Sequence, residues 1–153
     1  MSRPIEAEPG TTSAARSVPL VPDGDALLER ARDGAPSLET EAIAFRCHSG
    51  RRIDGRWTGV PVTRLLATAP PSTTHLLVEG AEGYRACVAV VEVMDGLVAV
   101  EATRGGVPVP ADELPRLVAD GLEAPRSVRG VTRVDAIALE SGADPEALER
   151  GRG

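Results

Sequence analysis

Cys47 offers the most versatile chemistry in this sequence, which contains two cysteines. It stands between Arg46 and His48, with Arg51 and Arg52 a few positions further on. Positive neighbours lower the pKa of a thiol, and the thiolate is both a nucleophile and a ligand for soft metals. Cysteine is also one of the residue types most often buried, as a small apolar side chain. The residues alone therefore leave two interpretations of Cys47 open: a functional thiolate and a buried core residue.

Other motifs for nucleophiles, metals and nucleotides are absent from the sequence. It contains no G-x-x-x-x-G-K-[ST], G-x-S-x-G, H-E-x-x-H or paired C-x-x-C pattern. His48 and His75 lie too far apart to predict a zinc site. Cys87 lies within RACVAVV, among small apolar residues, which indicates a buried structural cysteine. Any chemistry therefore depends mainly on Cys47.

The composition limits the partners of the chain. Its 153 residues carry a net charge of −6, which opposes non-specific binding to nucleic acid and to anionic membranes. Aromatic residues make up 2% of the chain, too few for a base-stacking surface. Two cysteines make no disulfide framework, the first residues do not resemble a signal peptide, and no apolar run approaches the roughly 20 residues of a membrane span. We expect a cytoplasmic protein with no nucleic-acid and no membrane partner.

The segment that carries Cys47 is predicted to be a β-strand. Residues 39–47, ETEAIAFRC, alternate so that Ile43, Phe45 and Cys47 share one face. The following RRIDGRWTG contains Asp54-Gly55, a strong signal for a two-residue hairpin turn. We therefore expect Cys47 to end a strand with its side chain on the apolar side.

Short helices are predicted at three places. DALLERARDG begins at Asp25, a residue type that favours helix starts. VPVTRLLATAPP has Pro61 at the position of a first turn and ends at Pro70-Pro71. Near the C-terminus, ADPEALERGRG has Asp144 as a cap before Pro145.

The second half of the chain is rich in predicted strands. These are HLLVEG, YRACVAVV, LVAVEA, VPVP, PRLVA and VTRVDAIAL, with brief connections. Many strands with few short helices predict a strand-rich α+β fold with a mixed sheet, and not a doubly wound parallel sheet. Composition further predicts a disordered tail over residues 1–24, one domain over 25–142, and a short tail or helix over 143–153.

Six segments follow one another in an order that resembles a known family. They are FRCHSG, GRWTGVPVTRLLATAPP, VEGAEGYRACV, LVAVEATRGGVPVP, LPRLVADG and RSVRGVTRVDAIAL. Together they cover about residues 41 to 141. Their order and spacing resemble the molybdopterin-binding domain of the sulfite oxidase family of oxidoreductases, although each motif by itself is short.

The resemblance implies a cofactor and a set of site residues. In that family one cysteine thiolate binds the molybdenum of a molybdenum-molybdopterin cofactor, and the metal moves an oxygen atom to or from a small substrate. Carried onto this chain, the metal ligand is Cys47. Arg116, Arg126 and Arg129 fall where the resembling segments carry basic residues near the cofactor's phosphate, which suits a forked guanidinium. Surface arginines are an equally good interpretation of each.

Three hypotheses follow for the function. The first is a molybdopterin-binding oxidoreductase domain that transfers oxygen on a small oxyanion or sulfoxide-type substrate and passes electrons to an unidentified partner. The second is a reduced, non-catalytic relative that serves as a binding or assembly module. The third is a redox-sensing thiol at Cys47 without a metal.

Overall fold

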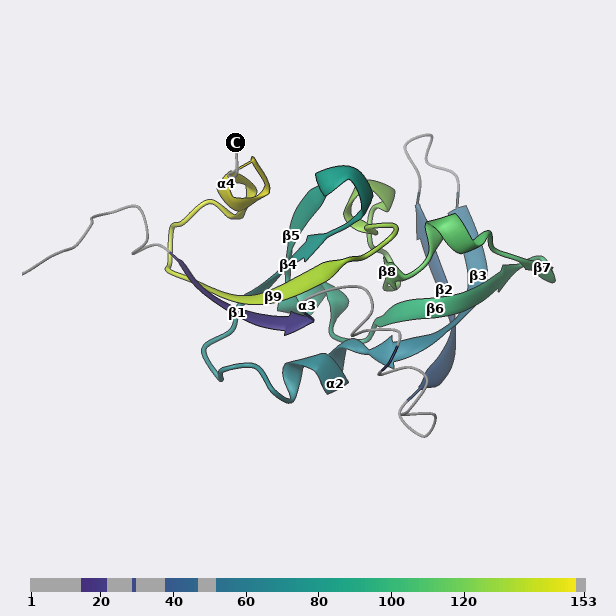
Figure 1. Cartoon of the computed structure of the whole chain (residues 1–153), viewed down its shortest axis with the longest axis horizontal. Coiled ribbons are helices and arrows are strands. Elements are labelled where there is room, and N and C mark those ends of the chain that lie inside the picture. Colours follow the sequence, from purple (N-terminus) through teal and green to yellow (C-terminus); the bar gives the residue numbers. More distant parts are fainter. Residues whose placement is uncertain (1–14, 22–28, 30–37, 47–51, 151–153) are drawn as a thin grey trace, which may run out of the picture.

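The computed structural model of the chain describes residues 15–21, 29, 38–46 and 52–150. Their strands form two sheets (Figure 1). Sheet A contains, in spatial order, β1 (Ala15–Val21), β9 (Arg133–Leu139), β4 (His75–Glu79) and β5 (Arg85–Ala89). Sheet B contains β2 (Glu39–Arg46), β3 (Arg52–Pro61), β6 (Leu97–Arg104) and β7 (Val107–Pro108), with β8 (Arg116–Val118) paired to β6.

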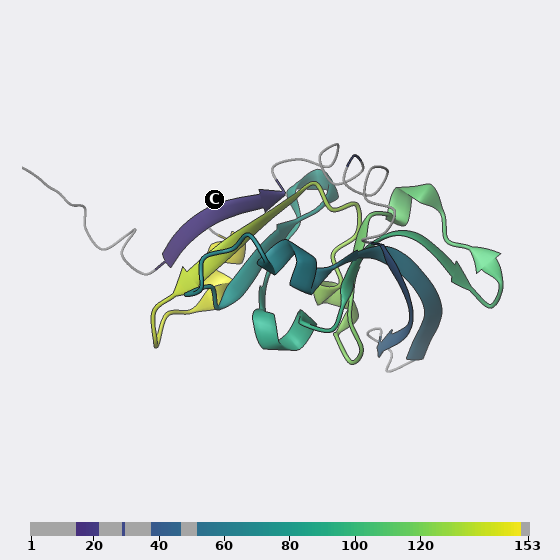
Figure 2. The ribbon, with the colours of Figure 1, turned by 90° about the horizontal axis from the view of Figure 1, so that it is seen from below.

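All pairs between these strands are antiparallel, and only short helices join them. The α-helices are α2 (Val62–Leu66), α3 (Val90–Val93) and α4 (Pro145–Arg150). The strand-rich α+β class predicted from the sequence is therefore confirmed, but the described strands form two antiparallel sheets and not the predicted mixed sheet. Sheet A lies toward one end of the molecule, and the β2–β3 hairpin with β7 lies toward the other (Figure 2).

The main core is built from the alternating apolar residues of both sheets. Leu76 and Val78 of β4 are each 1% exposed and pack in one cluster with Val98 of β6 and Leu117 of β8. Leu65 of α2 belongs to the same cluster, which explains why a helix of one turn is stable beside β3. Leu77, between Leu76 and Val78 of β4, is also buried and belongs to another cluster, so both faces of this strand are buried.

A second cluster surrounds Trp57 of β3, and it corrects the predicted hairpin turn. Asp54 and Gly55 lie inside β3, where they pair with Ala44 and Ile43 of β2, so a turn at Asp54-Gly55 is wrong. A Cβ at Gly55 would approach Trp57 Nε1 to 2.8 Å. The glycine therefore makes room for a fully buried indole, a packing role that local turn statistics do not represent.

Two further differences lie in the boundaries of elements. Ala15–Val21, inside the predicted tail, forms β1 and pairs with β9, where Val21 is buried. The last part of the predicted strand YRACVAVV is helix α3, because Glu92 accepts a hydrogen bond from the Ala89 N–H at 3.1 Å and caps it. The helix predicted from Asp25 falls outside the described residues, apart from Glu29.

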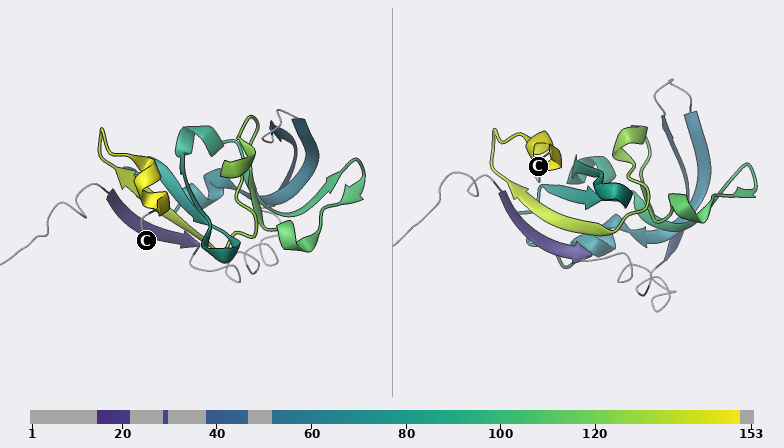
Figure 3. Two further views of the ribbon diagram at one scale, coloured as in Figure 1. Left: turned by 90° about the horizontal axis from the view of Figure 1, so that it is seen from above. Right: turned by 45° about the horizontal axis from the view of Figure 1, so that its top comes forward.

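The predicted helices at Pro61 and near the C-terminus are present as α2 and α4. Pro61, predicted in the first turn, is instead the N-cap of α2, with an extended ψ of 141°, one residue before the first helical position. Helix α4 packs against β5 and β4 of sheet A (Figure 3). Its Leu148 joins a small apolar cluster with Leu77 and Cys87.

Candidate functional site

A hollow of about 770 Å³ opens between the 3-10 helices η3 (Ala81–Gly83), η4 (Ala111–Glu113) and η5 (Ala124–Arg126). The charged residues of its lining are Glu82, Arg104, Asp112, Glu113, Arg116 and Arg129. Tyr84 also lines it and donates its hydroxyl proton to the carbonyl of Pro125. Three guanidinium groups and three carboxylates therefore surround one space, and the guanidinium groups are donors from which an anion with several oxygen atoms can accept.

Arg116 is the buried centre of this lining. It begins β8, is 6% exposed, and donates from Nε to Ser127 Oγ at 2.9 Å. Ser127 in turn donates to the carbonyl of Leu117, so the guanidinium is held from behind by a buried hydroxyl. The pKa of Arg116 is lowered to about 10, mainly by burial and next by the charge of Arg129, while Glu113 opposes the shift and Arg104 adds to it. A further anion in the hollow would stabilise the charged form of Arg116.

Arg104 and Glu113 join the site although the sequence analysis did not single them out. Arg104 ends β6, and its Nη2 donates to Glu113 Oε1 at 2.9 Å. The Gly105-Gly106 turn, with φ of 58° and 81°, returns the chain as β7 and thereby fixes the end of β6. The Gly105-Gly106 pair after Arg104 was a sequence signal for the turn that ends β6. Nothing local in the sequence links Arg104 to Glu113, which lies in η4 after β7.

Arg129 follows η5 in the chain and lines the same hollow. It forms an isolated antiparallel bridge with Arg116, and its carbonyl accepts a hydrogen bond from the Ala81 N–H at 3.4 Å. A Cβ at Gly80 would come within 2.4 Å of that carbonyl oxygen, so the close approach requires glycine there. The site thus brings the predicted residues Arg116 and Arg129 together.

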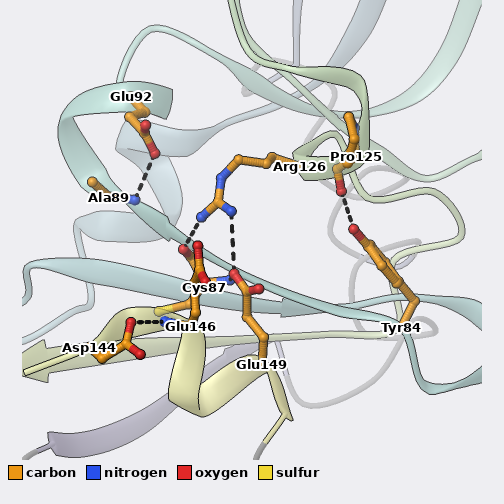
Figure 4. A network of polar contacts seen from close by, with 9 residues as sticks. All are labelled: Tyr84, Cys87, Ala89, Glu92, Pro125, Arg126, Asp144, Glu146 and Glu149. Carbon is orange, nitrogen blue, oxygen red and sulfur yellow. Dashed lines mark hydrogen bonds and ion pairs between the residues drawn. The ribbon is translucent and has the colours of Figure 1, made fainter. Parts of the chain in front are cut away.

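Arg126, the third predicted arginine, does not line this hollow. It lies at the end of η5, and its guanidinium donates to the carbonyl of Cys87 and pairs with Glu149 at 3.3 Å (Figure 4). The same figure shows Tyr84 on the far side of η5, beside Pro125. Helix η5 therefore separates Arg126 from the hollow, and its role in cofactor binding stays a prediction.

Of the two cysteines, Cys87 lies within the described residues and Cys47 does not. Cys47 directly follows β2 and lies outside the described residues, so its role as metal ligand stays a prediction. Cys87 is 1% exposed, and burial, followed by the nearby Glu149 carboxylate, raises the pKa of its thiol to about 11. This confirms the interpretation of Cys87 as a buried structural residue.

Within the described residues, no group of three or more His, Cys, Asp and Glu side chains is arranged to hold a metal ion. No helix in this part of the chain is long and apolar enough to cross a membrane.

The described residues form a strand-rich α+β domain with a hollow lined by three arginines and three carboxylates. The chain belongs to the oxidoreductase molybdopterin binding domain family, whose model matches residues 29–143. The resemblance inferred from the ordered motifs is therefore confirmed. No curated protein matched the chain.

A solved structure is similar to this fold. The crystal structure of the sulfane dehydrogenase SoxCD from Paracoccus pantotrophus superposes with a TM-score of 0.56 at 21% sequence identity. The match covers 84% of this chain and 39% of that chain, so this chain spans about two-fifths of its length. At this identity the likeness establishes the fold.

The residues of the hollow fit the anionic part of the cofactor that the family implies. A phosphate needs forked, charged donors, and Arg116 and Arg129 provide them from two segments that the Arg116–Arg129 bridge holds together. The low exposure of Arg116 strengthens its electrostatic attraction for an anion. The described residues thus supply donors that suit a phosphate, and the thiol expected to bind the metal is the one on Cys47.

Proposed function

We propose that this domain binds the molybdenum cofactor with the cofactor's phosphate in the arginine-lined hollow. The observation that carries the proposal is the buried Arg116 guanidinium, which Ser127 holds in place beside Arg129. Arg116 would bind and orient the phosphate through its fixed guanidinium, and Arg129, which is more exposed, would add a second charged donor. The rigidity of Arg116 limits the entropy lost when a ligand binds.

We further propose that Cys47 is the thiolate ligand of molybdenum and that the domain is an oxidoreductase. When bound, the cofactor would supply a redox-active metal that exchanges an oxygen atom with a small oxyanion or sulfoxide-type substrate. The protein's own part would be to fix the cofactor's phosphate, place the thiolate at the end of β2, and pass electrons to a separate acceptor. The low cysteine count supports a cytoplasmic setting for this activity.

The test is to purify the full chain from a host that makes the molybdenum cofactor and to quantify molybdenum and pterin per chain. Cys47→Ser is expected to remove the metal, and Arg129→Gln to lower the pterin content. Cys87→Ala and the exposed Arg64→Gln are the matched controls, because neither residue lines the hollow. Arg126→Gln tests the third predicted arginine separately.

The proposal would be supported by near-stoichiometric molybdenum and pterin in the wild type and both controls, with the metal lost in Cys47→Ser and the pterin lowered in Arg129→Gln. A folded wild-type protein that acquires neither from such a host would overturn it. That result would favour the non-catalytic binding or assembly module. A folded state is verified by an unchanged far-UV circular dichroism spectrum.

A further inference from the structure

Glu113 places one carboxylate oxygen between two guanidinium groups of the hollow. Its Oε1 accepts a hydrogen bond from Arg104 Nη2 at 2.9 Å and lies 3.6 Å from Arg116 Nη1. All three side chains line the hollow. The oxygen of Glu113 therefore occupies donors that an oxygen of a bound anion would otherwise use.

The two sides of Arg116 differ in how firmly they are held. On one side Ser127 is 2% exposed and accepts from Arg116 Nε inside the core. On the other side the Glu113 side chain is 23% exposed and belongs to η4, a 3-10 helix of three residues whose other members are also exposed. A change of side-chain rotamer can move the Glu113 carboxylate away without opening the core, while Arg116 stays in place.

We infer that Glu113 is a displaceable internal anion that competes with the ligand for Arg104 and Arg116. The inference rests on the proposed function of the hollow as an anion site. It adds that Glu113 pairs these arginines in the ligand-free protein and leaves them when an anion enters. An anion that binds Arg104 and Arg116 must therefore displace Glu113, which lowers the affinity of the hollow for weakly binding anions.

Charge explains why the competition selects among anions. The hollow has as many carboxylates as guanidinium groups, so a ligand must outcompete a full negative charge that is already in contact. A phosphate carries up to two charges and several acceptor oxygens and can engage both arginines at once, whereas chloride or acetate offers less. Glu113 thus favours phosphate groups over small monovalent anions.

Inorganic phosphate tests this inference directly. The full chain is produced without the cofactor, and phosphate is titrated while the Nε–H resonances of the arginines are followed by NMR. Glu113→Gln is expected to lower the dissociation constant for phosphate by about fivefold, the size expected when a partly exposed ion pair no longer competes. Asp112→Asn is the matched control, because it removes the same charge from the same lining at a residue outside the ion pairs of Glu113.

Two results would overturn the inference. Weaker phosphate binding by Glu113→Gln would mean that the carboxylate organises the arginines for the ligand. Equal effects of Glu113→Gln and Asp112→Asn would mean that only net charge matters. Glu113→Ala repeats the test if the glutamine variant is poorly folded, and absence of phosphate binding in the wild type and in both Glu113 variants also counts against it.

The outcome is separable from that of the proposed function. If Glu113→Gln tightens phosphate binding but the wild type acquires no pterin, the competition stands and the cofactor proposal fails. If the wild type acquires pterin and Glu113→Gln leaves the phosphate affinity unchanged, the cofactor proposal stands and the competition fails.

Discussion

Arg126 and Glu149 form an ion pair across the edge of sheet A, with Arg126 Nη1 3.3 Å from Glu149 Oε2 (Figure 4). The same carboxylate oxygen accepts from the Cys87 N–H at 2.8 Å, and Arg126 also donates to the Cys87 carbonyl. Cys87 lies in β5, the last strand of its sheet. The pair therefore satisfies both backbone groups of an edge residue, where unpaired groups invite pairing with another chain.

This arrangement predicts that Glu149→Ala lowers the free energy of unfolding by about 1 to 2 kcal/mol, because the Cys87 N–H and Arg126 both lose a charged partner. Urea unfolding followed by circular dichroism measures the change. Glu146→Ala is the control, since Glu146 is an exposed carboxylate of the same helix. Equal losses in the two variants would contradict the assignment.

Ser127→Ala is predicted to cost about 1 to 3 kcal/mol of unfolding free energy, because the buried Arg116 Nε loses its hydroxyl acceptor. The exposed Ser141→Ala should change stability by less than about 0.5 kcal/mol. Thermal and urea unfolding compare the two. A Ser127 variant as stable as the Ser141 variant would show that Arg116 does not depend on this hydroxyl.

Gly59→Ala is predicted to destabilise the protein by more than about 2 kcal/mol, because a Cβ there would lie 2.1 Å from the carbonyl oxygen of Val98. Gly59 lies at the register shift in the pairing of β3 with β6, and the atoms that its Cβ would meet belong to the backbone of β6. Gly83→Ala is the comparison, with a φ of 79° but open space around the Cβ, and should cost only about 1 kcal/mol. A Gly59 variant no less stable than the Gly83 variant would contradict the close approach.

The burial of the Cys87 thiol leads us to predict that the protein loses stability at alkaline pH. Burial raises the pKa of its thiol to about 11, so from the ordinary thiol pKa of about 8.5 upward the unfolded chain releases the proton while the folded protein keeps it. The unfolding free energy is unaffected by this group well below pH 8.5 and falls as the pH rises toward 11, by about 2 to 3 kcal/mol.

The measurement is urea unfolding between pH 7 and 11 in a Cys47→Ser background, with and without Cys87→Ala. The variant that lacks both thiols should lose less stability over this range. Parallel curves for the two proteins would show that the Cys87 thiol does not titrate differently on folding.

The strands and the family were predictable because their signals are local or ordered along the chain. LVAVEA and VTRVDAIAL are short segments rich in apolar and β-branched residues, and the structure places β6 and β9 there, each with a contiguous run of buried residues. The predicted turn at Asp54-Gly55 was wrong because its signal was only local. The dipeptide fits a hairpin turn locally, whereas Gly55 is required by the indole of Trp57 that packs against it.

By itself the sequence determined the class of fold, the series of family motifs and two of the arginines that line the hollow. Only the tertiary structure decided that Arg104 and Glu113 join them and that Arg126 turns to Cys87 and Glu149 instead. Arg116 and Arg126 are both arginines in family-like segments, so residue type and spacing cannot separate them. The Arg116 guanidinium lines the hollow, whereas the Arg126 guanidinium contacts Cys87. This difference depends on the packing of β8, β5 and α4, which are far apart in the chain.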